Sequence, residues 1–363
     1  MISQNLSRRF MQSRKMKHFV EPSTTSSPRT NLLDETDLAL VNALQAAPRA
    51  SWTLVGQALG ISAVTAARRW ERLRSSGLAW VTAYGGPFVQ QVNCAAFVEV
   101  DCVPSQVPAV TERLVHDPRI TGIEHVSGGT DLFLTVMVAD LTALSRLAVD
   151  AIGAQEGVTA TRSMIATHLF TEGSRWDLRS LDPGQRGLLR PADDTAPTGA
   201  ATLAPEDRPL LLALGKDGRL GYGELAELTG TSESTVRRRV TRLLREGSLV
   251  PRCEIAHGVS GFPVFVHYLA NVPSADLARV GASIAAASEV RLCAAIAARH
   301  SLLITAWVRS IPDTRRLEAH LAERFPELTI EDRRLTLANP KRMGHLLDTE
   351  GRSTGFVPMD MWA

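Results

Sequence analysis

The sequence is poor in cysteine and has no long apolar run. It contains four cysteines in 363 residues, and none of them stands in a CxxC pair, which argues against a disulfide scaffold and against a thiol-based zinc site. The four are Cys94, Cys102, Cys253 and Cys293. The longest apolar runs, such as Leu210–Leu214, are far shorter than the ~20 residues that a membrane span needs, and the N-terminus lacks the apolar segment of a signal peptide. We therefore expect a reducing, cytoplasmic setting, with no membrane partner, no metal and no cofactor.

The sequence also lacks a large excess of charge. Forty Lys and Arg oppose 38 Asp and Glu, giving a net charge of +2. Residues 1–30 hold six basic residues and one acid, or +5, so the remainder is near −3. Because the global charge does not point to a nucleic acid, such a partner has to be argued from local clusters.

The common catalytic motifs are missing. There is no GxxxxGK[ST], HExxH or GxSxG pattern, which argues against nucleotide-hydrolysing, zinc-protease and serine-hydrolase sites. Gly221-Tyr-Gly223 precedes an expected helix but lacks the rest of a dinucleotide-binding motif. No enzymatic activity is expected from these patterns.

What the sequence does contain is an internal duplication. Residues 37–80 align with residues 207–250 at an offset of 170 without a gap, and thirteen of the 44 pairs are identical, where chance would give two or three. The same offset returns for the apolar strand at 131–138 over 301–308. Two copies of one two-part unit therefore make up most of the chain.

The first part of each unit has the pattern of a helix-turn-helix. Short apolar helices are expected at Leu38–Leu44 and Thr53–Leu59, and Gly60 stands where a left-handed helix end is wanted. Ser62 is a suitable N-cap for a third helix, and the second copy repeats the arrangement. Trp70 is expected in the core of this domain rather than stacked on a base.

The third helix of each copy carries an arginine-rich face opposite its apolar stripe. A guanidinium makes bidentate bonds to guanine or to phosphate, and the major groove of DNA admits one helix. The same Ser-x-x-Thr-x-x-Arg-Arg-x-x-Arg pattern occurs twice, which favours DNA contact over a merely solvated surface. The candidate DNA-binding residues are Ser62, Thr65, Arg68, Arg69 and Arg72, and in the second copy Ser232, Ser234, Thr235, Arg237, Arg238, Arg239 and Arg242.

The second part of each unit has the order β-α-β-β-α-β, the ferredoxin-like arrangement of an antiparallel sheet with two helices on one face. In the first copy the strands are expected at 95–102, 120–126, 131–138 and 158–169. The other face of such a sheet must also be buried, so we expect two sheets to pair face to face, within the chain or between chains. The fold class is therefore α+β, with two copies of a winged helix-turn-helix domain followed by a ferredoxin-like domain.

These units resemble the Lrp/AsnC (feast/famine) family of transcription regulators, in a tandem-duplicated form. The resemblance is carried by Gly60-Ile61-Ser62, by Arg68-Arg69-x-x-Arg72-Leu73 and by the Gly128-x-x-Asp131-Leu-Phe-Leu strand, and it covers about residues 32–170 and 205–342. It implies double-stranded DNA as partner, a small-molecule effector such as an amino acid or a derivative, and a homo-oligomer formed through the sheet domains. The candidate effector-binding residues are Ser127, Gly128, Gly129, Thr130 and Asp131, and a Gly-Gly hairpin is the structural alternative for that loop. The second copy departs from the pattern, with Ala298 and Ser301 at the matching positions.

The domain boundaries follow from the two copies and the segments around them. They are a flexible basic arm at 1–30, helix-turn-helix domain 1 at 31–84, ligand-binding and oligomerisation domain 1 at 92–170, a linker at 171–204, helix-turn-helix domain 2 at 205–256, ligand-binding and oligomerisation domain 2 at 262–340, and a poorly ordered tail at 341–363.

Two other functions remain open at this point. Siroheme decarboxylases of haem biosynthesis are built on similar units, and the candidate histidines for that chemistry are His125, His168, His267 and His300. The third hypothesis is a ligand-sensing module that no longer binds DNA; the salt dependence of DNA affinity separates it from a regulator.

Overall fold

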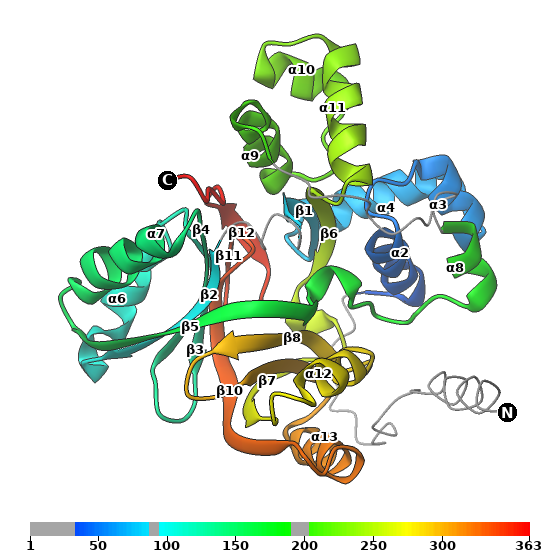
Figure 1. The fold of residues 1–363 in the computed structure, drawn as a ribbon. Coiled ribbons are helices and arrows are strands. Elements are labelled where there is room, and N and C mark those ends of the chain that lie inside the picture. Colours follow the sequence, from blue (N-terminus) through cyan, green and yellow to red (C-terminus); the bar gives the residue numbers. More distant parts are fainter. Residues whose placement is uncertain (1–32, 87–93, 190–202) are drawn as a thin grey trace, which may run out of the picture.

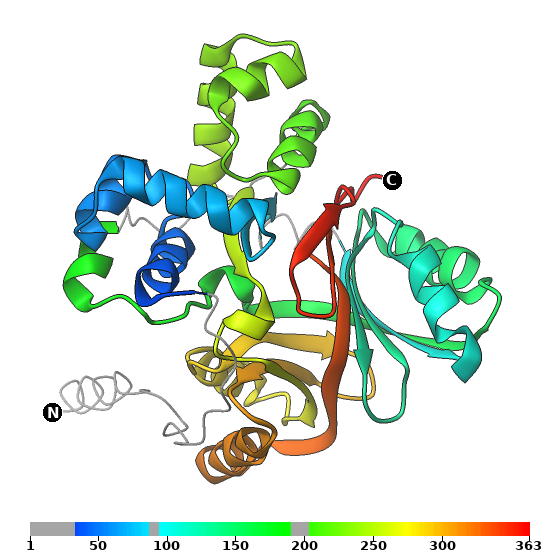
Figure 2. The same cartoon turned by 180° about the vertical axis from the view of Figure 1, so that it is seen from behind.

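The computed structural model describes residues 33–86, 94–189 and 203–363, and the fold below is that of these residues. The arm expected at 1–30 and part of the expected linker, 190–202, lie outside the described residues. Two small helical domains stand beside a larger body of strands and helices, as Figures 1 and 2 show from opposite sides. None of the described helices has the length and apolarity that a membrane crossing requires.

The first helical domain contains α2 (Glu35–Ala46), α3 (Trp52–Leu59) and α4 (Ala63–Ser75). Asp34 caps α2, and Asp37 completes the capping box. Gly60 ends α3 with φ +67°, and Ser62 caps α4 by accepting a hydrogen bond from the Thr65 N–H. The expected turn and cap are thus confirmed. The buried apolar stripe includes Leu40, Leu44, Val55, Ala66, Trp70 and Leu73.

The second helical domain repeats this plan with α9 (Arg208–Lys216), α10 (Tyr222–Thr229) and α11 (Glu233–Arg245). Gly230 ends α10 with φ +64°, and Ser232 caps α11. Its smaller core includes Leu210, Leu214, Leu225, Val236, Val240 and Leu243.

Each third helix leads into a strand, and the two strands pair with each other. β1 (Ala79–Gly85) and β6 (Leu249–Ile255) form a two-stranded antiparallel ribbon in which Thr82 faces Arg252. These residues are 170 positions apart, so each strand pairs with its own duplicate. The ribbon centre therefore lies on a pseudo-twofold axis that relates the two units.

The two larger domains both have the expected β-α-β-β-α-β order. The first contains β2 (Cys94–Cys102), α6 (Val107–Leu114), β3 (Ile120–Val126), β4 (Leu132–Val138), α7 (Leu141–Arg146) with a π-helical continuation at Leu147–Gly153, and β5 (Val158–Thr171). The second contains β7 (Val264–Asn271), α12 (Leu277–Ala285), β8 (Val290–Ala297), β9 (Leu302–Val308), α13 (Ile311–Arg324) and β10 (Thr329–Arg342).

The two sheets close into one ring of eight strands. The order is β10-β3-β4-β2-β5-β8-β9-β7, and β7 pairs again with β10. The long strands make this closure: β5 pairs with β2 and then β8, and β10 pairs with β7 and then β3. The inner faces meet in an apolar cluster that includes Phe97, Phe133, Met164, Leu269 and Leu303. The expected face-to-face pairing thus occurs within the chain.

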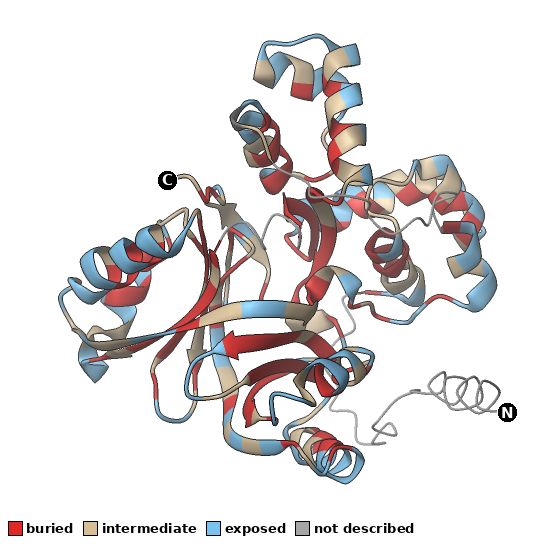
Figure 3. Ribbon diagram, viewed as in Figure 1, coloured by how far each residue is buried: buried red, intermediate tan, exposed pale blue. Residues whose placement is uncertain are grey.

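The helices of the sheet domains lie outside this ring. Figure 3 shows them with one buried face toward the strands and one exposed face toward solvent. Their buried sides join two separate cores, one under α6 and α7 and one under α12 and α13. Each sheet therefore has an outer core and shares the inner one.

The segment expected as a linker is partly structured and tied to the first helical domain. It forms α8 (Pro183–Leu189), and the backbone before this helix is held by α2. Asn42 Oδ1 accepts hydrogen bonds from the Ser180 and Leu181 N–H groups, and Gln45 Oε1 accepts one from Leu178 N–H. These contacts place the segment over the α2–α3 side of the domain.

The expectation of a poorly ordered tail is wrong. β11 (His345–Leu347) and β12 (Ser353–Phe356) extend the sheet beyond β10, with tight turns at Gly344 and Gly351. Arg208 at the start of α9 pairs with Asp360. The segment is ordered because it adds strands to the edge of the sheet and bridges to the second helical domain.

Candidate functional site

The two arginine-bearing helices share a free guanidinium at the same relative position. Arg68 on α4 and Arg238 on α11 are exposed, and within the described part of the chain neither forms a hydrogen bond, ion pair or ring contact. Both lie on the turn after the Ser-capped helix start, on the side away from the buried stripe. A planar, permanently charged donor in this position is free to bind a base edge or a phosphate.

The neighbouring arginines are held by carboxylates of the first helix in their own domain. Arg69 lies 2.7 Å from Asp34 and 2.9 Å from Asp37, and Arg72 lies 2.5 Å from Asp37. Burial would raise the pKa of Asp34, but hydrogen bonds from Arg69 and from the Asp37 N–H outweigh it, so its pKa is lowered. Arg242 repeats the pattern at 2.8 Å from Asp207. Three of the recurring arginines therefore fasten the third helix to the first.

Helix α11 carries two further arginines with local partners. Arg237 pairs with Glu233 at 2.8 Å and lies over the Tyr222 ring, 4.7 Å from its centroid. Arg239 donates to the Glu206 carbonyl at 3.4 Å. Ala67 occupies the position of Arg237 in the first copy, so the two helices present different surfaces.

The candidate hydroxyls form the helix caps. Ser62 Oγ lies 2.8 Å from Thr65 Oγ1, and Ser232 Oγ lies 2.9 Å from Thr235 Oγ1. Ser232 also lies 3.0 Å from Ser234 Oγ. These groups are at the exposed helix N-termini, where the unpaired N–H groups and the helix dipole favour an anion such as phosphate.

A reciprocal pair of arginines joins the two helical domains, and sequence reasoning did not assign it a role. Arg49 donates to the carbonyls of Gly218 and Leu220 at 2.5 and 3.0 Å, while Arg219 donates to those of Pro48 and Ala50 at 2.5 and 2.9 Å. Burial lowers the pKa of Arg219 to about 10. The pair was visible as one of the thirteen identities, but only the structure shows that each residue serves the opposite copy. Together with the ribbon, it joins the domains that carry α4 and α11.

The polar groups of the expected effector loop are largely engaged within the fold. Asp131 accepts the Cys102 N–H at 2.8 Å, buried Thr130 donates to the Val100 carbonyl, and Ser127 Oγ accepts the Leu335 N–H. Gly128 and Gly129 are exposed, and Gly128 has φ +103°. In the second copy Ser301 accepts the Val272 N–H at 2.9 Å, which is the contact that Asp131 makes in the first.

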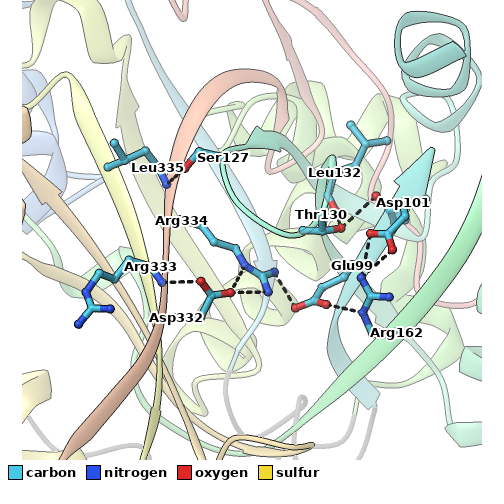
Figure 4. A network of polar contacts seen from close by, with 11 residues as sticks. Glu99, Asp101, Ser127, Thr130, Leu132, Arg162, Asp332, Arg333, Arg334 and Leu335 are labelled. Atoms are coloured by element: carbon cyan, nitrogen blue, oxygen red, sulfur yellow. Dashed lines mark hydrogen bonds and ion pairs between the residues drawn. The ribbon is translucent and has the colours of Figure 1, made fainter. Parts of the chain in front are cut away.

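A charged hollow lies beside this loop. Glu99 stands between Arg162 and Arg334, 2.9 Å from the first and 2.6 Å from the second (Figure 4). Arg299 and His300, from the β8–β9 loop, line the same hollow, whose empty volume is about 1030 Å³ with its open mouth included. The second copy's loop thus lines the hollow, and the first copy's loop approaches it at Gly128, where a β-carbon would lie 3.6 Å from Arg334 Cγ.

The four candidate histidines of the enzyme hypothesis each have separate surroundings. His125 lies 2.9 Å from Thr111, and burial lowers its pKa. His168 packs on Phe170, His267 lies 3.0 Å from Glu124 inside the ring, and His300 lines the hollow. Over residues 33–86, 94–189 and 203–363, no group of three or more His, Cys, Asp or Glu side chains could hold a metal ion.

Similarity to known proteins agrees with this architecture. The AsnC-type helix-turn-helix domain matches residues 33–74 and 207–244, and the Lrp/AsnC ligand binding domain matches residues 95–175. An HTH-type transcriptional regulator of Pyrococcus horikoshii is 30% identical over 136 residues, which are 37% of this chain and 86% of that protein. The chain belongs to the Lrp/AsnC family. Because its helix-turn-helix occurs twice, this family member carries two DNA-binding-type domains in one polypeptide.

Two further comparisons concern a second transcription regulator and a solved structure. The transcriptional regulator FL11 of Pyrococcus furiosus is 25% identical over 142 residues, 39% of this chain and 93% of FL11. A solved structure of the siroheme decarboxylase NirDL, in complex with an iron-uroporphyrin III analogue, superposes with a TM-score of 0.56 at 13% identity, over 85% of this chain and 93% of that one. At that identity the likeness shows a shared fold over both units of this Lrp/AsnC protein and does not show a shared activity.

Proposed function

We propose that this Lrp/AsnC-type regulator binds double-stranded DNA as a covalent pseudo-dimer and reads two adjacent half-sites with α4 and α11. The observation that carries the proposal is that Arg68 and Arg238 are equivalent, exposed and without a partner among the described residues. The recurring arginines beside them, such as Arg69 and Arg242, are paired. Two half-sites about one helical turn apart need two readers in a fixed relation, and the ribbon and the Arg49–Arg219 contacts, which join the two helical domains, support this. Because both readers are in one chain, dimerisation does not limit binding on dilution. Such a regulator works in the cytoplasm, where it meets chromosomal DNA.

The test is DNA binding by the intact protein at two salt concentrations. Fragments bound from a genomic or random pool are identified first, and the affinity of the best fragment is measured by fluorescence anisotropy. We expect a steep loss of affinity with salt, and a further loss in the double variant Arg68→Ala/Arg238→Ala. Arg279→Ala is the matched control, since Arg279 is an exposed arginine on α12, outside both helical domains. No sequence-selective binding at low salt, or equal affinity for the double variant and the wild type, refutes the proposal.

We further propose that an amino acid or a derivative acts as effector at the loop Ser127–Asp131 and the adjoining hollow. The support is chemical: Arg299 and His300 suit a carboxylate, whereas Glu99 and the other acids of the hollow suit an ammonium group. The proposal is tested by isothermal titration calorimetry with the twenty amino acids. Arg299→Ala should weaken the binding, while Arg315→Ala, which removes an exposed arginine on α13, should not.

We propose that higher assemblies use the outer surfaces of the sheet domains, since the inner faces are already paired within the chain. Light scattering of the eluting protein reports the assembly size directly. We also propose that the protein is not an enzyme, because the candidate histidines do not gather around one cavity. Decarboxylation of an added siroheme by the purified protein would overturn this.

A further inference from the structure

A second cavity lies at the other end of the ring, under the ribbon that joins the helical domains. It is bounded by the start of β3, the end of β4, the ends of β5 and β10 and the middle of β6. Its empty volume is about 970 Å³, part of which opens to solvent. Neither the expected effector loop nor the hollow beside it contributes to its wall, so it is a separate site.

The wall of this cavity carries an unusual concentration of buried positive charge. The guanidinium groups of Arg252, Arg291 and Arg342 are all buried, and all three pair with the same carboxylate, that of Glu254. Lys341 is fully buried beside them and donates to the carbonyls of Val115 and Asp117 at 2.7 and 2.8 Å. Because a buried charge is unfavourable unless it is paired, one carboxylate shared by three guanidiniums leaves positive charge uncompensated.

The nearby acids do not remove this imbalance. Glu172 lies 3.8 Å from Arg252 and accepts a hydrogen bond from the Tyr84 hydroxyl. Glu124 is engaged by His267 and Thr336. Desolvation lowers the pKa of Arg291 to about 9 and that of Lys341 to about 8. For Arg252 the desolvation is outweighed by Glu254 and Glu172, and the pKa is raised, so these acids compensate Arg252 rather than the whole cluster.

Several hydrogen-bonding atoms on this wall have no partner within the described residues. They are the Nε and Nη2 atoms of Arg342, the Nε atom of Arg252 and the Oδ1 atom of Asn339. Arg342 and Arg252 are 7% and 8% exposed. Buried polar atoms are almost always satisfied in folded proteins, so the three arginine N–H groups that line this cavity indicate an acceptor from outside the chain, and the Asn339 oxygen indicates a donor.

The remaining wall is apolar and aromatic. Trp307 stacks on Phe265 at 4.1 Å between ring centroids, and Arg291 lies over Trp307 at 3.7 Å. Phe97 and Phe133 close the inner side of the cavity. A ligand that fits such a wall has an anionic end for the guanidiniums and an apolar body for the rings.

The cationic residues of the wall come from the second copy of the duplication, and the first copy has no cation at the matching positions. Arg252 corresponds to Thr82, Arg291 to Thr121, Lys341 to Thr171 and Arg342 to Glu172, each at the offset of 170. The cavity lies near the pseudo-twofold axis, where a homodimer would have to present each residue twice. Fusion of the two units permits one cationic side and one side of neutral and acidic residues, as a single asymmetric ligand requires.

We propose that this cavity binds a small organic carboxylate with an apolar, preferably aromatic, body, and that binding alters the DNA-binding domains through β6. Arg252 carries the connection, because it lines the cavity and also faces Thr82 at the centre of the ribbon. Gly173 lets it approach: a β-carbon there would lie 2.3 Å from the Arg252 guanidinium carbon. Binding itself does not depend on the proposed function, whereas its effect on DNA does.

Ligand binding is tested first, without DNA. Phenylpyruvate, phenylalanine and phenylacetamide are titrated into the full chain by calorimetry, with the shift in melting temperature as a second readout. We expect the two carboxylates to bind and the neutral amide not to bind. The comparison of the 2-oxo acid with the amino acid shows whether an ammonium group is also recognised. No binding by either carboxylate, or equal binding by the amide, overturns the proposal.

Two variants assign the binding to this wall. Arg342→Met removes a buried guanidinium whose hydrogen bonds to Glu254 and to the Ile255 carbonyl are both long, at 3.4 Å, and keeps an apolar chain against the Phe265 and Trp307 rings. We expect it to melt no lower than the wild type and to lose at least ten-fold in carboxylate affinity. A purely structural arginine would instead lower the melting temperature, which would overturn the assignment. Arg333→Met is the control, because Arg333 lies on the same strand but is half exposed and pairs with Glu318.

The effect on DNA is tested last. The saturating carboxylate should change the operator affinity of the wild type at least five-fold and that of Arg342→Met not at all. Carboxylate binding with an unchanged operator affinity overturns the connection through β6 and leaves the site in place. A protein that binds the carboxylate but no DNA refutes the proposed function instead.

Discussion

The clearest separation of roles on the recognition helices is between Arg238 and Arg242. Arg242 pairs with Asp207, which is 2% exposed, whereas Arg238 has no partner in the described part of the chain. Removing one member of a fully buried ion pair costs about 3–5 kcal/mol, because the other charge is left uncompensated. The Arg242 side chain is 37% exposed and also pairs with Glu246, so solvent screening reduces this cost. We expect Arg242→Ala to lower the stability of the domain by about 1–3 kcal/mol. Arg238→Ala should change stability by less than about 0.5 kcal/mol.

Hydrogen exchange is the appropriate assay, because unfolding of a multidomain chain is not described by one free energy. In the Arg242→Ala variant, amides of α9 and α11 should exchange about 5- to 150-fold faster, the equivalent of 1–3 kcal/mol. Arg245→Ala removes an exposed, unpaired arginine from the same helix and serves as control. Operator affinity should fall about 5- to 150-fold in Arg238→Ala, with its exchange unchanged. Unchanged protection in Arg242→Ala, or faster exchange in Arg238→Ala, would refute this division of roles.

Three further predictions concern the contacts between the helical domains, a buried histidine and the difference between α4 and α11. The double variant Arg49→Ala/Arg219→Ala removes four hydrogen bonds between the helical domains, each worth about 1 kcal/mol. In a gel-shift series it should bind operators with altered half-site spacing almost as well as the operator with the natural spacing. His345 is buried, and desolvation is the main reason that its pKa is lowered to about 3. Between about pH 3 and 6.5 the unfolded state therefore binds more protons than the folded state, and the free energy of unfolding falls as the pH falls through that window. The ring-preserving variant His345→Phe should show a flatter melting-temperature profile there, and an unchanged slope would contradict the assignment. Because Arg237 stands where the first copy has Ala67, a footprint should reveal an imperfect palindrome, and equal protection of a perfect one would count against it.

Local patterns were enough to predict the duplicated units. The Gly60 turn and the Ser62 cap depend on backbone conformation and on one side-chain contact, both of which are encoded within a few residues. The β-α-β-β-α-β order follows equally from periodicity and turn residues. Such features survive in the folded chain because no distant contact competes with them.

Contacts between residues that are distant in the chain could not be predicted from the sequence. The helical spacing that places Arg69 and Arg72 on a polar face does not reveal that Asp37, more than 30 residues earlier, binds both. The two sheets close into a ring because β5 of the first copy pairs with β8 of the second, and β10 of the second copy pairs with β3 of the first. The tail was misjudged for the same reason, since β11 is stable only against the edge of a strand that the whole fold must first assemble.

The duplication explains how one molecule combines a symmetric and an asymmetric task. Contacts that position the recognition helices are reciprocal, as in Arg49 and Arg219, and have stayed identical in both copies because each half serves the other. The cavity under the ribbon is subject to no such constraint, because residues 170 positions apart lie on opposite sides of one space. There Arg291 and Thr121, or Arg342 and Glu172, have diverged into a cationic side and its neutral or acidic counterpart. A ligand without twofold symmetry therefore acts on a pair of domains that retain twofold symmetry. Arg252 belongs both to the ribbon between these domains and to the wall of the cavity.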